Sequence, residues 1–342
     1  MEIMNYSKVS IDEVKMKSVL ITGGLGFIGA QIAQEMIKEN MVDKVVLLDH
    51  YGGFINPLRS DFQDYRKYRL EGIEDKVIIE RGETRNSIIM TKLIDKYRPN
   101  YIIHTAALPL AKIDNLNAAE AREGSVDSTA QILEIINFFK LKDGYCPLRF
   151  TYFSSSMIYG DFQSEIATED HQKRPKEVYG TMKLAGEVIT RGLADFYGIP
   201  YTIVRPSAVY GPTDMNRRVS QIFIEKALNK QKIKVHGKDE KLDFTYIKDI
   251  AHGAVLATTE DKGAGEAFNI THGKAHTLLD YVKCLNHHFS DLEYDIVPRD
   301  AFRPKRGTLS IEKARTLIGY NPKYSLQEGV DEYVEFIRKN KY

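Results

Sequence analysis

The sequence contains little cysteine and almost no net charge. Only two cysteines occur among 342 residues, Cys146 and Cys284, and they lie far apart and outside any metal-ligand spacing. This excludes a disulfide-stabilised fold and a cysteine-rich metal centre, so we expect no metal site and two free thiols in a reducing compartment. The 48 basic and 47 acidic residues leave a formal charge of +1. That balance gives no electrostatic reason to expect nucleic acid or a membrane surface as a partner.

Long hydrophobic runs are also absent. No stretch approaches the roughly 20 apolar residues that a membrane-spanning helix needs, and residues 1–16 lack the apolar core of a secretory signal. We therefore expect a short N-terminal arm and a cytoplasmic protein. With 43% hydrophobic and 28% charged residues the composition is that of a globular protein, and the length allows one large or two smaller domains.

Short apolar runs alternate with helical patterns through the first part of the chain. The predicted strands are Ser18–Thr22, Lys44–Asp49, Val77–Glu80, Tyr101–His104, Phe150–Ser154 and Tyr201–Arg205. The predicted helices are Phe27–Lys38, Ser87–Tyr97, Ala118–Lys140 and Tyr179–Tyr197. This alternation predicts an α/β fold with a doubly wound, Rossmann-type parallel sheet covered by helices on both faces.

The alternation weakens in the second half, which indicates two interleaved domains. The sheet domain is predicted to cover 17–205 with returns near 243–271, namely a strand and helix over Asp243–Thr258 and a strand over Ala267–Thr271. A smaller α/β domain is predicted to comprise 206–242 and 272–342.

The polar stretch between the second and third strands, 50–76, is read as an insertion, with a short helix predicted over Arg59–Tyr68. It forms either a flap over the ligand site or a surface decoration.

A glycine-rich turn joins the first strand to the first helix. Gly24-x-Gly26-x-x-Gly29 and Gly23-x-x-Gly26-x-x-Gly29 both fit dinucleotide-binding fingerprints. Glycines permit a tight turn and a close approach of the backbone to a pyrophosphate, while amides at the helix N-terminus supply an anion site. Because the motif lies between a strand and a helix, as the fingerprint requires, we predict a bound dinucleotide.

Asp49 ends the second strand, twenty positions after Gly29. A carboxylate there accepts hydrogen bonds from both ribose hydroxyls and repels a 2′-phosphate. His50 and Tyr51 follow it, where an arginine would suit a phosphate. These residues favour NAD over NADP as the cofactor. The alternative is that Asp49 only caps the strand end.

Tyr179 and Lys183 are four residues apart and share one face of a predicted helix. A nearby lysine and a positive nicotinamide both favour the phenolate, and so lower the pKa of a tyrosine toward that of a useful base. Ser154-Ser155-Ser156 ends the fifth strand, at the edge of the sheet where ligands bind. This combination points to hydride transfer between a nicotinamide and an alcohol or ketone, although the Tyr-Lys spacing alone also fits a solvated helix face.

Taken together, these motifs resemble the extended short-chain dehydrogenases/reductases, in the group of NAD-dependent nucleotide-sugar epimerases and dehydratases. The resemblance runs from about residue 17 to the end of the chain, through Thr22–Gly29, His104–Ala107, Ser154–Gly160, Tyr179–Lys183, Arg205–Pro212, Asp243–Ile250 and Ile311–Pro322.

The resemblance implies Ser155, Tyr179 and Lys183 as the catalytic set, with Tyr179 as the base. It also implies that an acidic residue, here Glu83 in place of the more usual aspartate, contacts the adenine. The predicted cofactor-binding residues are Gly23, Gly26, Phe27, Ile28, Gly29, Asp49, His50, Glu83, Thr84, Ala106, Ala107, Lys183 and Pro206.

Two positions after the catalytic hydroxyl distinguish the reactions of this family. Members that eliminate water carry an Asp-Glu pair there, and members that epimerise at C3 or C5 carry a cysteine at the second position. Here the residues are Ser156 and Met157, which cannot do acid/base work at neutral pH. This leaves oxidation at C4 of a nucleotide-diphosphate sugar, with Ser156 and Met157 expected to contact the substrate, unless the methionine only packs beneath the nicotinamide.

The residue that binds the substrate diphosphate is predicted among the arginines. The family's usual arginine before Asp243-Phe244 is Leu242 here, so another basic residue must take its place. The candidates are Arg303 and Arg306 in the late segment, and Arg217 and Arg218. Leu108-Pro109-Leu110 also departs from the polar residues frequent there, which indicates either an unusual sugar or a different loop.

The resemblance implies 4-epimerisation through a transient 4-keto sugar, with a 4-dehydrogenase that releases the keto product as the alternative. A decarboxylase or reductase of the same family is a further possibility, and a non-catalytic dinucleotide-binding protein is the hypothesis from another class. A homodimer is expected, because helices Ala118–Lys140 and Tyr179–Tyr197 are those that pair between subunits in this family. Their apolar faces could equally belong to the core of one chain.

Overall fold

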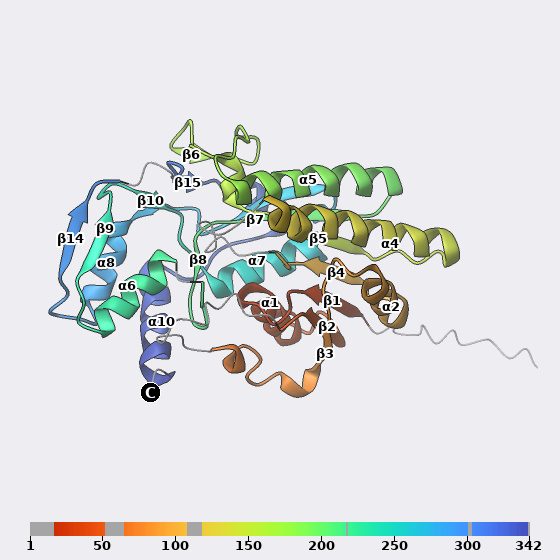
Figure 1. Cartoon of the computed structure of the whole chain (residues 1–342), viewed down its shortest axis with the longest axis horizontal. Helices are drawn as coiled ribbons and strands as arrows, with labels where there is room; N and C mark the ends of the chain where they lie inside the picture. Colours follow the sequence, from red (N-terminus) through yellow and green to blue (C-terminus); the bar gives the residue numbers. More distant parts are fainter. Residues whose placement is uncertain (1–16, 52–64, 108–117, 217, 300–302, 341–342) are drawn as a thin grey trace, which may run out of the picture.

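The computed structural model describes residues 17–51, 65–107, 118–216, 218–299 and 303–340. Its centre is a seven-stranded parallel sheet (Figure 1). The strand order is β12 (Glu266–Ile270), β7 (Tyr201–Pro206), β5 (Arg149–Phe153), β4 (Tyr101–His104), β1 (Ser18–Thr22), β2 (Lys44–Asp49) and β3 (Val77–Arg81). The order reverses between β1 and β4, so the ligand-binding crevice of a doubly wound sheet is expected at their carboxyl ends.

Helices cover both faces of the sheet, because its central strands are apolar on both sides. On one face α1 (Phe27–Lys38) packs against α7 (Ile247–Thr259). On the other lie α2 (Ser87–Tyr97), α4 (Ser128–Asp143) and α5 (Val178–Tyr197), with α4 between the other two. Successive residues of β1 enter different cores: Val19 and Ile21 join the α1–α7 side, and Leu20 joins the α2–α4 side. The predicted doubly wound α/β fold is confirmed.

A second group of elements extends to the left of the sheet in Figure 1. It contains α6 (Val219–Leu228), α8 (Leu278–Asn286), α10 (Leu326–Asn340) and the parallel pair β9 (Ile233–His236) and β14 (Tyr294–Val297). The remaining elements are short: β10 (Lys241–Leu242) with β13 (His276–Thr277), β6 (Ile166–Ala167) with β15 (Thr308–Leu309), β8 (Val209–Tyr210) with β11 (Thr245–Tyr246), and the helices α3 (Ala118–Arg122) and α9 (Glu312–Ile318).

The six strands predicted for the first part of the chain agree with the structure to within one residue at each end. The helix predicted over Ala118–Lys140 needs correction, because α3 and α4 are separated by a π-helical turn over Glu123–Asp127. Within that turn Gly124 weakens the regular helix, and the Ser128 hydroxyl donates to the Gly124 carbonyl oxygen at 3.1 Å.

The predicted returns to the main sheet are only partly found. β12 does join the sheet beside β7, and α7 packs against it. The strand expected after Asp243 is instead the two-residue β11, which pairs with β8 outside the main sheet. The helix predicted over Arg59–Tyr68 falls partly outside the described residues, and its described end is a single 3₁₀ turn, Arg66–Tyr68.

Candidate active site

The glycine-rich turn between β1 and α1 is so tight that only glycine fits at its key positions. Gly23 has a φ of +68°, and a Cβ there would lie 2.9 Å from the amide nitrogen of Ala106. Cβ atoms at Gly26 and Gly29 would lie 2.8 and 2.4 Å from the carbonyl oxygen of Gly23. The turn therefore presents bare backbone at the switch point of the sheet, which is the environment that a dinucleotide pyrophosphate requires.

The N-terminus of α1 completes this anion site. Its N-cap is Gly26, which offers no side chain to the first amides of the helix. Phe27 is the first helical residue and its ring is buried in the core, so Phe27 and its neighbour Ile28 can contribute backbone amides. Uncapped amides and the positive end of the helix dipole favour a negatively charged ligand.

Asp49 lies at the carboxyl end of β2, beside the glycine turn. Its carboxylate accepts hydrogen bonds from the amides of Leu25 and Tyr51, both at 3.1 Å, and lies 3.3 Å from the ring nitrogen Nδ1 of His50. Burial raises the pKa of Asp49, but these hydrogen bonds outweigh burial and lower it overall. Asp49 thus caps the turn as an ionised carboxylate, and its predicted contact with the ribose is compatible with that role.

Glu83 and Thr84 lie in the turn after β3, at the same edge of the sheet. The Gly82 amide donates to the carbonyl oxygen of Asp49 at 3.0 Å, which holds the two segments together. Glu83 pairs with Arg85, while the carbonyl oxygen of Thr84 accepts a bond from Gln131 at 2.8 Å. The segment predicted to contact the adenine is therefore adjacent to the segment predicted to contact the ribose.

Three other predicted cofactor residues lie at the carboxyl ends of central strands, on the same edge of the sheet as the glycine turn. Ala106 and Ala107 come after β4, where the Ala106 amide lies 3.4 Å from the Thr22 hydroxyl oxygen. Pro206 is the last residue of β7. Since parallel strands end on one side of a sheet, the structure brings all the predicted cofactor residues to one edge.

Ser155 begins a 3₁₀ turn, Ser156–Tyr159, directly after β5. Its hydroxyl oxygen accepts a hydrogen bond from the Met157 amide at 3.2 Å, which fixes the side chain at the start of the turn. Ser156 and Met157 are 1% and 5% exposed. The predicted catalytic hydroxyl therefore lies on a buried and well-packed segment.

Tyr179 and Lys183 lie on the first turns of α5. Glu177 caps this helix by accepting bonds from the amides of Tyr179 and Gly180, at 2.9 and 2.8 Å. The ammonium nitrogen of Lys183 donates to the carbonyl oxygen of Phe153 at 2.7 Å and lies 5.8 Å from the centre of the Tyr179 ring. The cap and this bond hold the predicted base and its lysine against the end of β5.

Burial shifts the pKa values of Lys183 and Tyr179 in opposite directions. Burial lowers the pKa of Lys183 to about 7. Burial raises the pKa of Tyr179, although the charge of Arg218 and a hydrogen bond with the Ser155 side chain act in the other direction. The protein alone therefore keeps Tyr179 protonated at neutral pH, and a further positive charge beside the ring is needed to form the phenolate.

Three of the predicted diphosphate-binding arginines, Arg218, Arg303 and Arg306, here called the arginine cluster, influence one another electrostatically, and Arg218 also acts on Tyr179. Burial lowers the pKa of Arg306 to about 10, and the charges of Arg218 and Arg303 add to this effect. Glu240 and Glu177 offset part of this repulsion. A cluster of cations that repel one another is stabilised by a bound dianion such as a diphosphate. The remaining candidate, Arg217, lies outside the described residues, and so do residues 108–110, which were expected to bear on the choice of sugar.

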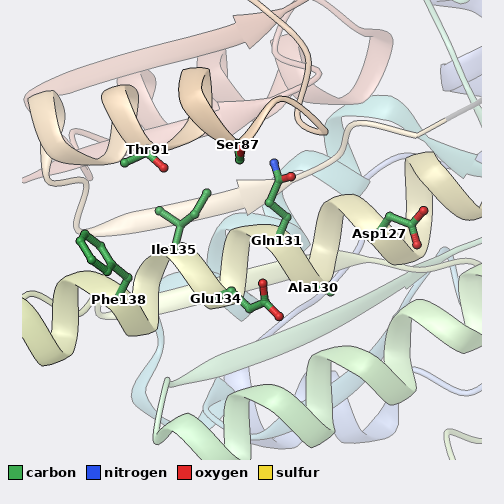
Figure 2. Close-up of a pocket in the computed structure, with 8 residues that line it drawn as sticks. All are labelled: Ser87, Thr91, Asp127, Ala130, Gln131, Glu134, Ile135 and Phe138. Atoms are coloured by element: carbon green, nitrogen blue, oxygen red, sulfur yellow. The ribbon is translucent and has the colours of Figure 1, made fainter.

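Two hollows lie near these elements. One, of about 590 Å³, is lined by Arg306, Lys305 and Lys241 and by residues of β6 and β15. The other, of about 450 Å³, lies between α2 and α4, where Gln131 and Ile135 point toward α2 (Figure 2). The first adjoins the arginine cluster, whereas the second contains none of the predicted site residues.

A buried ionic network behind the site was not predicted from the sequence. Arg205 donates to both carboxylate oxygens of Glu187, at 2.8 and 2.7 Å, and the two side chains are 1% and 2% exposed. Arg205 also donates to the Tyr159 hydroxyl and the Glu169 carbonyl, both at 2.9 Å. Tyr159 in turn donates to Asn269 at 2.8 Å. The only sequence signal was Glu187, four residues after Lys183 and therefore on the same helix face.

His104 is a second buried group that the sequence did not reveal as part of the site. One ring nitrogen lies 2.7 Å from the Thr22 hydroxyl and the other 3.2 Å from the Ser128 hydroxyl. Burial, and secondarily the charge of Lys183, lower the pKa of His104 to about 3. The imidazole is therefore neutral, and it links the ends of β1 and β4 to α4.

Comparisons with known proteins agree with this geometry. Residues 19–271 match the model of the NAD dependent epimerase/dehydratase family. The structure is similar to that of a UDP-glucuronic acid 4-epimerase from Bacillus cereus in complex with UDP-glucuronic acid and NAD. The TM-score is 0.82 at 26% identity, over 94% of this chain and 99% of that one.

Two further relatives differ in their reactions. A UDP-glucose 4-epimerase from Thermotoga maritima, crystallised with UDP-glucose, gives a TM-score of 0.81 at 25% identity, over 95% of this chain and 100% of that one. A dTDP-glucose 4,6-dehydratase of Salmonella typhimurium is 26% identical, over 94% of this chain and 93% of its own length. The chain belongs to the NAD dependent epimerase/dehydratase family, the nucleotide-sugar branch of the extended short-chain dehydrogenases/reductases.

Proposed function

We propose that this protein is a nucleotide-sugar 4-epimerase, which oxidises C4 of a nucleotide-diphosphate sugar and then reduces the 4-keto intermediate on its other face. The observation that carries the proposal is the convergence of Ser155, Tyr179 and Lys183 at the end of β5, with an arginine cluster beside Tyr179. The three side chains supply proton transfer at a carbinol, and the cations supply a diphosphate site.

Each residue has a distinct part in this proposal. Tyr179 removes the proton of the C4 hydroxyl, and Ser155 donates a hydrogen bond to the same oxygen. Lys183, fixed by the carbonyl of Phe153, holds the cofactor ribose beside Tyr179. NAD, when bound, accepts the hydride from C4 and returns it.

The dehydratase reaction of the Salmonella relative is disfavoured by two side chains. Elimination of water requires an acid and a base beside the sugar. The corresponding residues are Ser156 and Met157, and both are buried without a carboxyl group. A hydroxyl and a thioether do not exchange protons with carbon or with a leaving hydroxyl at neutral pH, so we propose chemistry at C4 alone.

The substrate side is proposed to be the arginine cluster. Arg218 precedes α6 and donates to the carbonyl oxygen of Val209 at 3.3 Å, while its buried Nε atom has no hydrogen-bond partner among the described residues. Arg306 contributes from the segment before β15, and Arg303 lies three residues earlier. Planar guanidinium groups bind diphosphate oxygens in pairs.

A homodimer is also proposed. Large apolar side chains stand exposed on both helices expected at the subunit contact: Phe138 and Leu141 on α4 are 53% and 80% exposed, and Val188 and Phe196 on α5 are 62% and 83% exposed. Their burial in a second copy would stabilise the dimer by the hydrophobic effect. The cytoplasmic location stays a prediction, and no helix in the described ranges is long and apolar enough to cross a membrane.

The test is to incubate the purified protein with UDP-, GDP-, CDP- and dTDP-sugars. Inversion at C4 without net formation of NADH supports the epimerase. A released 4-keto product with stoichiometric NADH identifies the 4-dehydrogenase instead. Retention of NAD with no change in any sugar would support the non-catalytic alternative and contradict the proposal.

A further inference from the structure

Residues 65–73, here called the strap, connect the glycine turn to the part of the chain that carries the substrate arginines. Arg69 is the link. One guanidinium nitrogen donates to the carbonyl oxygen of Leu25 within the glycine turn, and the other donates to the carbonyl oxygen of Thr213, each at 2.8 Å. The carbonyl oxygen of Arg69 itself accepts a bond from Gln34 on α1 at 2.9 Å.

The strap is anchored by packing as well as by hydrogen bonds. Tyr65 is 4% exposed, and its ring packs edge-on against the Phe336 ring of α10 with the ring centres 5.3 Å apart. The Tyr68 ring packs against the same Phe336 ring with the centres 5.4 Å apart. Leu70 and Ile73 join the core on the α1 side of the sheet. The strap therefore connects the elements around the main sheet with the second group, which contains α10. It is neither a flap over the ligand site nor a surface decoration.

Thr213 is held in an unusual backbone conformation. Its φ is +68°, a region that β-branched residues rarely adopt. Such a conformation is disfavoured by roughly 5- to 150-fold and persists only where the surroundings impose it. The hydrogen bond from Arg69 to its carbonyl oxygen is one such constraint. Without that bond, we expect the segment to relax to an ordinary negative φ.

Asp214, the residue after Thr213, interacts electrostatically with the arginine that acts on Tyr179. Asp214 is fully buried, and the nearby charges of Arg218 and Arg69 both act to lower its pKa against the effect of burial. Arg218 in turn lowers the pKa of Tyr179. Thr213 is therefore connected, through the neighbouring Asp214, to the arginine whose charge acts on Tyr179.

We propose that Arg69 is a positioning residue that couples the dinucleotide turn to Thr213 and Asp214, so that a cofactor bound at the turn fixes the arginine side of the site. The Leu25 peptide is held from both sides, because its amide donates to Asp49 and its carbonyl oxygen accepts from Arg69. Ordering of the turn by a ligand is therefore transmitted through one guanidinium to Thr213. Sites linked in this way show coupled affinities. The coupling itself does not depend on the proposed reaction. Only the choice of UDP as the probe in the second test rests on the proposed function.

The first test uses NAD alone, in hydrogen exchange of the full-length protein. In the wild type, NAD slows exchange in both the glycine turn and residues 211–219, each by about fivefold or more. In Arg69→Met, NAD slows exchange in the glycine turn only. Lys67→Met, an exposed change in the same strap, behaves like the wild type. Slowing at 211–219 that survives in Arg69→Met, or that is absent from the wild type, overturns the proposal.

The second test measures the affinity for UDP by calorimetry, with and without NAD. NAD tightens UDP binding to the wild type by about fivefold or more, and this factor falls to about one in Arg69→Met. Arg69→Met also binds UDP more weakly than the wild type, because Thr213 relaxes from its left-handed conformation. Adding Thr213→Gly restores this affinity, since glycine adopts that conformation without strain, but does not restore the coupling. Equal coupling in wild type and Arg69→Met contradicts the proposal. Failure of UDP to bind the wild type contradicts the proposed function, and the exchange experiment still decides the role of Arg69.

Discussion

Replacing Glu187 by glutamine should strongly destabilise the protein, because the change removes one partner of a buried ion pair. The guanidinium of Arg205 makes two bonds to Glu187, and both side chains are at most 2% exposed. Glutamine keeps the shape but can accept with only one atom, and its amide group then faces a buried cation. Breaking a buried pair in this way costs about 3–5 kcal/mol.

This cost converts into a measurable shift in melting temperature. An unfolding entropy of roughly 2.1 cal/mol/K per residue over 342 residues gives about 0.7 kcal/mol/K. The Glu187→Gln variant should therefore melt about 4–7 °C below the wild type, as followed by circular dichroism at neutral pH. Urea unfolding should show a lower midpoint with an unchanged slope.

Two control variants separate burial of the charge from the chemical change itself. Asp295→Asn makes the same carboxylate-to-amide change in the ion pair of Asp295 with Lys232, and these two side chains are 50% and 49% exposed. This variant should lose less than about 1 kcal/mol of unfolding free energy. The double variant Glu187→Leu/Arg205→Met removes both buried charges and should recover most of the stability. If Glu187→Gln costs no more than Asp295→Asn, the reasoning about this network is wrong.

Three further predictions concern the cofactor turn, the base and a buried histidine. Gly29→Ala should abolish NAD binding in calorimetry, because its Cβ would lie 2.4 Å from the Gly23 carbonyl oxygen; unchanged affinity refutes the turn geometry. Tyr179→Phe should lower kcat by about 10²–10⁴-fold while NAD still binds, and full activity would remove Tyr179 as base. The free energy of unfolding should fall as pH drops from 6.5 to about 3, by up to about 5 kcal/mol, since unfolded His104 takes up a proton that the folded protein excludes. His104→Gln should flatten this dependence, and an equal slope in both proteins would contradict it.

The sequence predicted the parts of the fold that depend on local pattern. The strands of the sheet are apolar runs bounded by turns, and the glycine motif has a fixed spacing, so both were located to within a residue. Ser155 and Tyr179, predicted as parts of one catalytic set, lie beside one another in the structure, and their catalytic roles stay a prediction. These features are encoded within short windows of the chain.

Features that depend on distant partners were not predictable in this way. Arg205 lies on a strand and Glu187 on a helix, and the spacing of Glu187 from Lys183 indicates its helix face but not its partner. Arg69 contacts Thr213, which lies 144 positions away. The π-helical turn at Glu123–Asp127 was read as regular helix, because no proline interrupts the segment from Ala118 to Lys140. β11 was assigned to the main sheet, because a two-residue strand carries no information about its partner.

The most direct test of the central claim is to follow C4 of the sugar. The protein, with NAD bound, should be incubated in deuterated water with UDP-glucose and, separately, UDP-glucuronic acid, and the products analysed by NMR. Our account predicts inversion at C4 of at least one nucleotide sugar with no deuterium at any carbon, because the hydride leaves and returns through the cofactor. Deuterium at C5 with loss of the C6 hydroxyl would show elimination of water, and would contradict the assignment of Ser156 and Met157.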